Sequence, residues 1–360
     1  MYSDSDLEAA VAAGALSPDA AAGLRTYVSD RRASPAVDEE HFRLLTGFND
    51  IFVAIAAVIL LVAVAWIGNA IPPRMDGDGP SIWAGFAVAA TAWGLAEFFT
   101  RKRRMALPSI ILLLAFVGGV FTTAAVALGL MVPEHVIENN NLLAGTLISL
   151  CAALAAGGAY VHWRRFKVPI TVAAGAAAVA GIVIGFVVAA VHDLPEQENV
   201  LLGTVLALGI AVFLFAMRWD SSDPTRQTRR SDVAFWLHLL AAPMIVHPVF
   251  ALLGLTDGNA SVIEAAIVVL VYILLGLTAL AIDRRALLVS ALAYVLWALS
   301  DLFERFGAIE LNFALTAFVI GSALLLLSAF WHSVRAMIVR PLPAGLQAKL
   351  PGVDRVAVPA

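Results

Sequence analysis

Four polar side chains in the carboxy-terminal half of the sequence could do chemistry together: His247, Glu264, Asp301 and Glu304. His247 lies deep in one apolar stretch and Glu264 about one turn inside the next, while Asp301 and Glu304 are three residues apart and share a helix face. A histidine with three carboxylates could bind a cation or pass protons near neutral pH. We expect this candidate polar site to face an outer vestibule. The simpler alternative is a kinked helix with a hydrogen-bonded histidine and carboxylates at the membrane surface.

The stretch WLHLLAAPMIVHPVF, which contains His247, also carries an unusual backbone signal. Pro243 and Pro248 each lack an N–H group and free the carbonyl four residues earlier, so they mark a candidate helix break. His238 and His247 are nine residues apart and point to opposite sides of a helix, which argues against a shared metal ion. We expect no metal site and no cofactor. No zinc spacing, phosphate-binding glycine loop or nucleophile elbow indicates an enzyme.

Composition places these residues in a membrane. Of the 360 residues, 61% are hydrophobic and only 14% are charged, which is more apolar surface than a soluble domain can bury. A helix needs about 20 apolar residues to cross a bilayer, and continuous apolar runs of that length exclude the alternating pattern of a membrane barrel. We predict an all-α polytopic transmembrane helix bundle of about ten spans. The predicted spans are 51–71, 82–100, 106–131, 141–162, 167–191, 199–217, 233–255, 261–282, 286–302 and 311–332.

Basic residues set the expected orientation. Lys and Arg resist translocation, and with both chain ends on the cytoplasmic side all of the 23 Lys and Arg residues except Arg74 and Arg305 fall on that side. We therefore predict an N-in/C-in topology. Arginine doublets stand before four of the spans, at 103–104, 164–165, 229–230 and 284–285.

The doublets also suggest an internal repeat. Each interval between them holds one helix going out, an acidic turn and one helix coming back, which predicts five like-oriented hairpin repeats. Pro108 and Pro169 stand at the same offset from their doublets and favour a duplication. The alternative is that this spacing appears in any ten-helix protein whose Lys and Arg residues stay on the cytoplasmic side, a tendency that we call the charge rule.

Three regions follow along the chain. Residues 1–49 form an expected cytoplasmic helical hairpin and linker, in which Gly14 ends the first helix and Ser17 caps the second at Pro18. Residues 50–332 are the transmembrane domain, and residues 333–360 are a cytoplasmic tail that we expect to be mostly extended. The hairpin is too small for a core of its own, so we expect it to dock on the membrane domain, a protein partner or another copy of the chain.

Two local patterns predict packing. Gly181 and Gly185 form a small-xxx-small seam, which lets helix backbones approach closely within the fold or between copies. Glu97 and Arg101 are four residues apart and predict an ion pair along one helix. Charged residues within the predicted spans are otherwise scarce, which argues against a deep proton relay and against a strongly charged substrate.

The tail phrase GALSPDAAAGL, followed by a linker and hydrophobic hairpins with basic inner loops, resembles bacterial polytopic membrane proteins grouped as a family of unknown function. The resemblance implies a multi-pass protein of the bacterial plasma (inner) membrane and carries over no functional residue. From the number of spans we favour a permease or channel-like transporter of a small, weakly charged or lipophilic solute. The alternative is a non-transport scaffold or sensor that binds a partner through its amino-terminal hairpin. The basic clusters follow the charge rule and face lipid head groups, so nucleic acid is not an expected partner.

Overall fold

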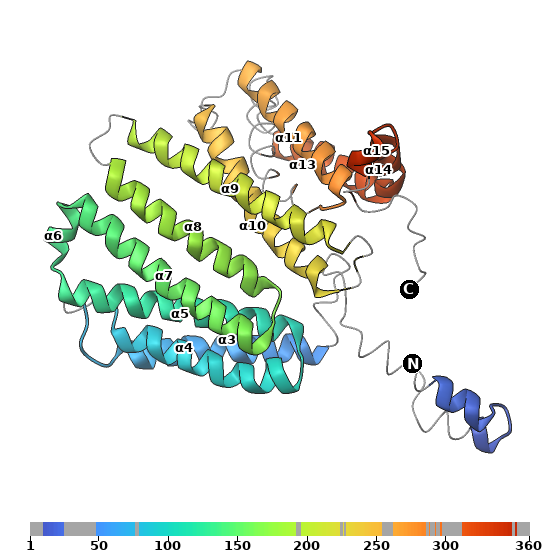
Figure 1. Cartoon of the computed structure of the whole chain (residues 1–360), viewed down its shortest axis with the longest axis horizontal. Helices are drawn as coiled ribbons and strands as arrows, with labels where there is room; N and C mark the ends of the chain where they lie inside the picture. Colours follow the sequence, from blue (N-terminus) through green and yellow to red (C-terminus); the bar gives the residue numbers. More distant parts are fainter. Residues whose placement is uncertain are drawn as a thin grey trace.

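The chain is helical throughout the part that the computed structural model describes. The described residues are 10–24, 48–75, 79–191, 196–223, 226, 228–253, 262–285, 288, 292, 296, 312–347 and 350. Figure 1 shows α3 to α10 side by side, with α11, α13 and α14 following at one edge of this row. The elements are α3 (Phe48–Asn69), α4 (Ile82–Ala96), the π-helical turn η2 (Glu97–Lys102), α5 (Ala106–Met131), α6 (Glu134–Glu138), α7 (Asn141–Phe166), α8 (Ile170–Val191), α9 (Gln197–Ser221), α10 (Arg229–Leu252), α11 (Val262–Ile282), α13 (Asn312–Ala329), α14 (Trp331–Val339) and α15 (Ala344–Gln347).

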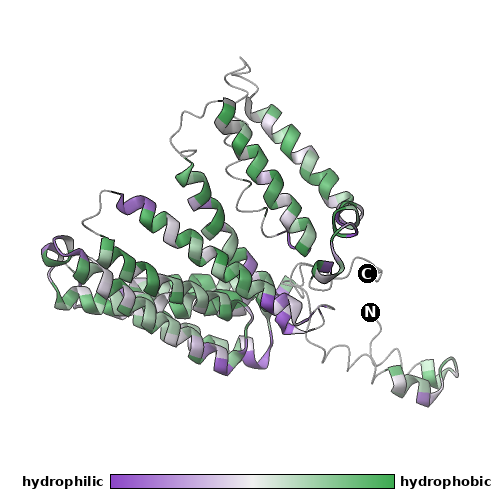
Figure 2. Cartoon of the chain, turned by 45° about the horizontal axis from the view of Figure 1, so that its top comes forward, coloured by the Kyte–Doolittle hydropathy of each residue, from purple (hydrophilic) through white to green (hydrophobic). Residues whose placement is uncertain are grey.

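The long helices identify an integral, multi-pass membrane protein. Among the described residues, seven helices are long and apolar enough to cross a bilayer: α3, α4 with η2, α5, α7, α8, α9 and α10. Their outward faces carry large apolar side chains such as Phe48, Trp66 and Leu214, which are 83%, 78% and 61% exposed. Figure 2 shows hydrophobic residues along the shafts and hydrophilic ones gathered toward helix ends. This distribution suits a surface that faces hydrocarbon.

The first seven predicted spans each coincide with one of these helices. The eighth, 261–282, corresponds to α11, and the ninth, 286–302, lies almost wholly outside the described residues. The tenth, 311–332, differs from the prediction because α13 ends at Ala329 and the chain bends by 73° into α14. The described structure therefore supports seven spans, or eight if the bent pair is one span. The expected extended tail also begins later than residue 333, since α14 continues to Val339.

The amino-terminal hairpin has the turn that its sequence predicts. Gly14 has a φ of 72°, in the left-handed region that ends helices. The Ala20 N–H donates to the Ser17 hydroxyl at 3.2 Å, which is the expected N-cap bond. The first nine residues and the linker 25–47 lie outside the described residues.

Four connections meet at one end of the bundle, which we call the arginine end. They join η2 to α5, α7 to α8 and α9 to α10, and the fourth follows α11. Each contains one non-glycine residue in the left-handed region: Arg104 (φ 55°), Lys167 (φ 57°), Arg226 (φ 53°) and Asp283 (φ 58°). Side-chain contacts link these connections, as Arg165 bonds Glu97 at 2.7 Å and Arg226 bonds Asp283 at 3.4 Å. A left-handed residue stops a helix abruptly, so the chain reverses here in short turns.

Glycine allows the helices joined at this end to touch backbone to backbone. A Cβ added at Gly185 would lie 2.7 Å from the Gly145 carbonyl oxygen, and one at Gly181 would lie 3.3 Å from the Cβ of Ala152. The Gly181/Gly185 seam therefore packs α8 against α7 within the fold. The close approach leaves no room for a side chain at Gly185 and little room for one at Gly181.

Helix α10 occupies the centre of the described bundle. Half of its most apolar window is buried, against 17–33% for the other six spans. It runs without interruption through Pro243 and Pro248, so the helix break expected there is not seen. The carbonyl of Met244, which Pro248 leaves without its usual donor, lies against Gly209 of α9, where an added Cβ would be 2.8 Å from that oxygen. Helix α9 therefore packs closely against α10 at the position where α10 lacks one of its own hydrogen bonds.

Replacing Gly145 by Ala should destabilise the protein, because the new methyl group would overlap Gly185 and the backbone nitrogen of Ala189 at 2.6 Å. Overpacking of this kind costs about 1–3 kcal/mol. The matched control is Gly157→Ala on the same helix, where nothing lies within 4 Å of the added Cβ. Thermal unfolding in detergent should show a lower Tm for the first variant and an unchanged or slightly higher Tm for the second. Equal Tm values would contradict the close contact.

Candidate functional site

The four residues of the expected outer site are not brought together in the described part of the chain. His247 lies on α10 with an exposed side chain. Glu264 lies in the first turn of α11, with its side chain outside the described residues, and Asp301 and Glu304 fall outside them altogether. His238 is fully buried, so the two histidines face opposite sides of α10, as their spacing predicts. A cluster of the four residues stays a prediction.

A different polar site occupies the arginine end, and its centre is Asp220 at the last turn of α9. Arg284 donates to both carboxylate oxygens of Asp220, from Nε at 3.1 Å and from Nη2 at 2.5 Å. His238 Nε2 lies 3.2 Å from Asp220 Oδ2. The Arg284 guanidinium also donates to the Ser231 hydroxyl at 3.0 Å. Arg284 and His238 are 0% exposed and Asp220 is 5% exposed, so the Asp220–Arg284 ion pair and the imidazole beside it have been removed from solvent.

A second ion pair continues the site toward α14. Asp283 follows α11 and binds Arg226 Nη1 at 3.4 Å, while Arg226 Nη2 donates to the carbonyls of Ile282 and Asp283 at 3.2 and 2.9 Å. The indole N–H of Trp331 donates to Asp283 Oδ1 at 2.7 Å, and Arg335 Nε lies 3.8 Å from the same oxygen. We call the whole set the Asp–Arg network. Its members are Asp220, Arg226, Ser231, His238, Asp283, Arg284, Trp331 and Arg335.

The energetics of the network follow from burial. Moving a charge out of water costs several kcal/mol per ion, and only a close partner with further hydrogen bonds offsets that cost. Arg284 meets this condition through a bidentate pair, the strongest geometry between arginine and a carboxylate. The bonds cross between α9, α10, the end of α11 and α14, so separating any of these elements would leave a charge unpaired. The network therefore clamps four elements at the arginine end.

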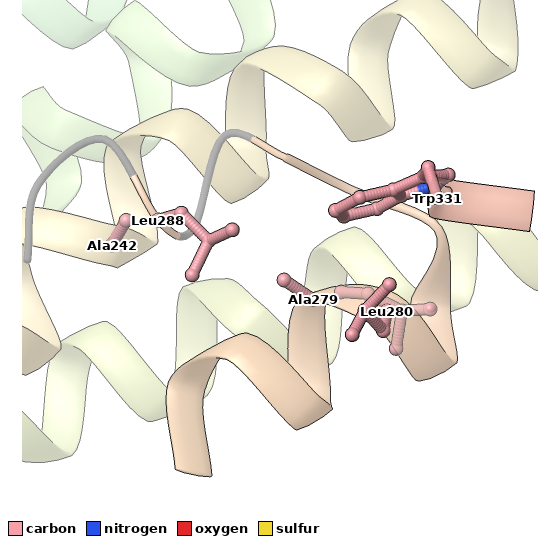
Figure 3. Close-up of a cluster of buried hydrophobic side chains, with 6 residues drawn as sticks. Ala242, Ala279, Leu280, Leu288 and Trp331 are labelled. Carbon is pink, nitrogen blue, oxygen red and sulfur yellow. The ribbon is translucent and has the colours of Figure 1, made fainter. Parts of the chain in front are cut away.

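An apolar cavity of about 200 Å³ adjoins the network and shares Trp331 with it. We call it the leucine–tryptophan cavity. Its lining residues are Tyr272, Arg285, Leu288, Leu292, Leu324, Leu327, Ser328 and Trp331. Figure 3 shows Leu288 and Trp331 facing Ala279 and Leu280 of α11, in the buried cluster beside this cavity.

Three polar side chains, Tyr272, Arg285 and Ser328, stand among the apolar walls of the cavity. The guanidinium carbon of Arg285 lies 4.7 Å from the centroid of the Trp331 ring, and Arg285 Nη1 is 3.4 Å from the Ser328 hydroxyl. The Tyr272 hydroxyl is buried and has no hydrogen-bond partner among the described residues. Burying a hydroxyl without a partner is costly, so this group is available to a bound molecule. The cavity thus offers apolar walls, one cation and two hydroxyls, of which the Ser328 hydroxyl accepts from Arg285.

The amino-terminal half has a separate polar contact at the same end. Arg101 lies 3.2 Å from Glu97, which confirms the ion pair expected from their spacing, and Arg165 binds the same carboxylate at 2.7 Å from another helix. The Glu97 and Arg165 side chains are 32% and 41% exposed. Exposed pairs contribute little to stability. This contact resembles the Asp–Arg network in composition and differs from it in burial.

No family model, curated protein or solved structure matches this chain. Among the described residues, no group of three His, Cys, Asp or Glu side chains is placed to hold a metal ion.

Sequence reasoning missed the Asp–Arg network because its residues lie at helix ends. The basic character of the inner loops accounts for Arg226, Arg284 and Arg335 without any buried partner, and Asp220 and Arg284 lie outside the predicted spans. The structure therefore buries more charge than the composition of the spans predicts. The signal that could have revealed the network is the presence of Asp220, Asp223, Asp232 and Asp283 in segments that the charge rule requires only to be basic.

Replacing Asp220 by Asn should be strongly destabilising, because it leaves Arg284 buried without a counter-charge. Breaking a buried pair costs about 3–5 kcal/mol, measurable by reversible unfolding of the full chain in mixed detergent micelles. The control is Glu97→Gln, which removes one charge from the exposed pair with Arg165 and should change stability little. If both variants behave alike, the burial of the network is contradicted.

Proposed function

We propose that this membrane protein is a permease for a small lipophilic solute of weak negative charge, and that the leucine–tryptophan cavity is its binding site. The observation that supports the proposal is the combination of apolar walls with a single guanidinium at Arg285. Binding pockets typically have this character, with mostly apolar lining and a few polar groups that orient the ligand. A volume of about 200 Å³ is below the 300–1,000 Å³ of drug-sized sites, which suits a small solute or one end of a longer chain.

Trp331 connects the leucine–tryptophan cavity to the Asp–Arg network, because it belongs to both. Its ring forms a wall of the cavity, and its N–H donates to Asp283 in the Asp–Arg network. A solute that displaces the ring also removes a hydrogen bond from Asp283. Ligands shift conformational equilibria only through contacts that differ between states, and this contact is such a difference. We propose that the network is closed without solute and loosens when the cavity is filled.

We further propose an N-in/C-in arrangement of ten spans in five hairpins, with the arginine end at the cytoplasmic face of a bacterial inner membrane. Support comes from the basic doublets, which stand before four of the predicted spans and resist translocation. Each of the four described connections at that end also contains one residue in the left-handed region, but these residues stand at different offsets from their doublets and carry no argument for duplication.

A scaffold or sensor remains the second candidate. A vestibule at the expected polar site would support transport, but none of the cavities described is lined by His247, Pro243 or Pro248. In that function, the amino-terminal hairpin would bind a protein partner or another copy. Leu24 on the second helix of the hairpin is 39% exposed and would need to be covered. Neither candidate assigns a catalytic reaction to the chain.

Photolabelling tests the cavity directly. The full chain in lipid nanodiscs is exposed to a medium-chain carboxylic acid that carries a diazirine, irradiated, and mapped by mass spectrometry. We expect labels on the peptides that contain Leu292 or Leu324 to Trp331, and competition by the unlabelled acid. Leu324→Trp fills the cavity and should reduce labelling about tenfold, equivalent to 1.4 kcal/mol.

The matched control is Leu325→Trp, at a neighbouring position that is 74% exposed and lies outside the cavity lining. Its labelling should equal that of the wild type. Equal labelling of Leu324→Trp and Leu325→Trp would mean that the probe enters from lipid without a site, and the proposal would fail. Acids that compete are then tested for counterflow in proteoliposomes. Binding without flux would exclude the permease and favour the sensor.

A further inference from the structure

A second concave site lies at the arginine end on the outer surface of α9 and α10. It has a volume of about 470 Å³ and is separate from the leucine–tryptophan cavity. We call it the two-arginine groove. Its lining residues are Phe215, Arg218, Trp219, Ser221, Ser222 and Arg230. Arg218 belongs to the last turn of α9 and Arg230 to the first turn of α10, so the two cations reach the groove from different spans.

The arginines of this groove differ from most of their neighbours in having no partner. Arg165 is ion-paired with Glu97, Arg284 is paired with Asp220, and Arg285 stacks on Trp331. Among the described residues, the side chains of Arg218 and Arg230 have no hydrogen bond, ion pair or ring contact, and both are exposed. Two like charges therefore converge on one hollow, and no described carboxylate pairs with either of them. This arrangement favours a bound anion.

The face of α9 that leads to the groove suits an acyl chain. Ile210, Leu214 and Arg218 follow at intervals of four residues and lie on one side of the helix. Ile210 and Leu214 are 46% and 61% exposed, and Phe215 in the groove wall is 41% exposed. Trp219 stands at the level of the arginines, where the membrane–water interface favours indole rings. An apolar strip therefore ends at two guanidinium groups.

The hydroxyl groups of the groove do not compete for the anion. Ser221 donates to the Arg218 carbonyl at 3.1 Å and Ser222 donates to the Trp219 carbonyl at 2.7 Å. Both bonds cap the carbonyl end of α9. The guanidinium groups are thus the groove's charged donors, and each can bind two oxygens of one phosphate at once.

We propose that the two-arginine groove binds the phosphodiester head group of one anionic phospholipid, whose acyl chains lie along Leu214 and Ile210. The phosphate bridges the end of α9 and the start of α10. These are the segments that carry Asp220 and Ser231 of the Asp–Arg network, two residues after Arg218 and one residue after Arg230. Bound lipid therefore stabilises the clamp from outside. The proposal stands whether or not the protein is a permease.

Native mass spectrometry of the full chain, released from detergent micelles with defined lipid, tests the site. The probes are dioleoyl phosphatidylglycerol and dioleoyl phosphatidylcholine, which share their acyl chains. The test variant is Arg218→Gln with Arg230→Gln. The control is Lys102→Gln with Arg229→Gln, which removes the same charge from exposed residues at the same end that do not line the groove. Unfolding temperature in lipid-free detergent checks that both variants are folded.

For the wild type we expect the first phosphatidylglycerol to bind about tenfold more tightly than the first phosphatidylcholine, a difference that corresponds to 1.4 kcal/mol. The test variant should lose this preference and the control should keep it. Added phosphatidylglycerol should also slow hydrogen exchange in residues 218–230 of the wild type and of the control, and should not do so in the test variant. Equal loss in test and control variants would show general attraction to positive charge and overturn the site. Displacement of the lipid by millimolar inorganic phosphate would identify a soluble anion as the ligand and would overturn the lipid assignment.

Discussion

The cost of holding a charge away from water dominates the carboxy-terminal half of this protein. Helices in a bilayer gain no hydrophobic free energy by leaving lipid for one another, so close packing and polar contacts must hold them together. Arg284 and His238 are completely buried at the end of the bundle, and Asp220 is the group that makes their burial tolerable. The arrangement of α9, α10, α11 and α14 at this end surrounds the buried Arg284 charge and the His238 imidazole with partners.

The amino-terminal half meets the same requirement in another way. There, α7 and α8 touch at Gly145 and Gly185, and the ion pair between Glu97 and Arg165 remains partly exposed. Backbone contact of this kind is rigid because nothing can slide without a clash. An ionic clamp can instead open when one partner changes. The proposed conformational change, in which the Asp–Arg network loosens, therefore belongs to the carboxy-terminal half. That half also contains the leucine–tryptophan cavity and the two-arginine groove.

How far the sequence predicts this structure depends on which physical signal each part carries. Long apolar runs located the first seven spans, and glycine spacing identified the Gly181/Gly185 contact, since both depend on residues close together in the chain. The Asp–Arg network joins Asp220 to Arg284 across 64 positions, and no local pattern reports such a pairing. The two prolines of α10 predict a helix break that the structure does not have. Helix α10 continues through Pro243 and Pro248, and Gly209 of α9 packs closely against it at Met244.

A double-mutant cycle of Asp220 and Arg284 measures whether the two residues form a buried ion pair. The free energy of unfolding is measured for the wild type, Asp220→Asn, Arg284→Gln and the double variant. If the two residues are a buried pair, the double variant loses less than the sum of the single losses by about 1–3 kcal/mol, because removing the second charge relieves the first. Losses that add to within about 0.5 kcal/mol would show that the two groups do not interact, and the clamp at the arginine end would be wrong.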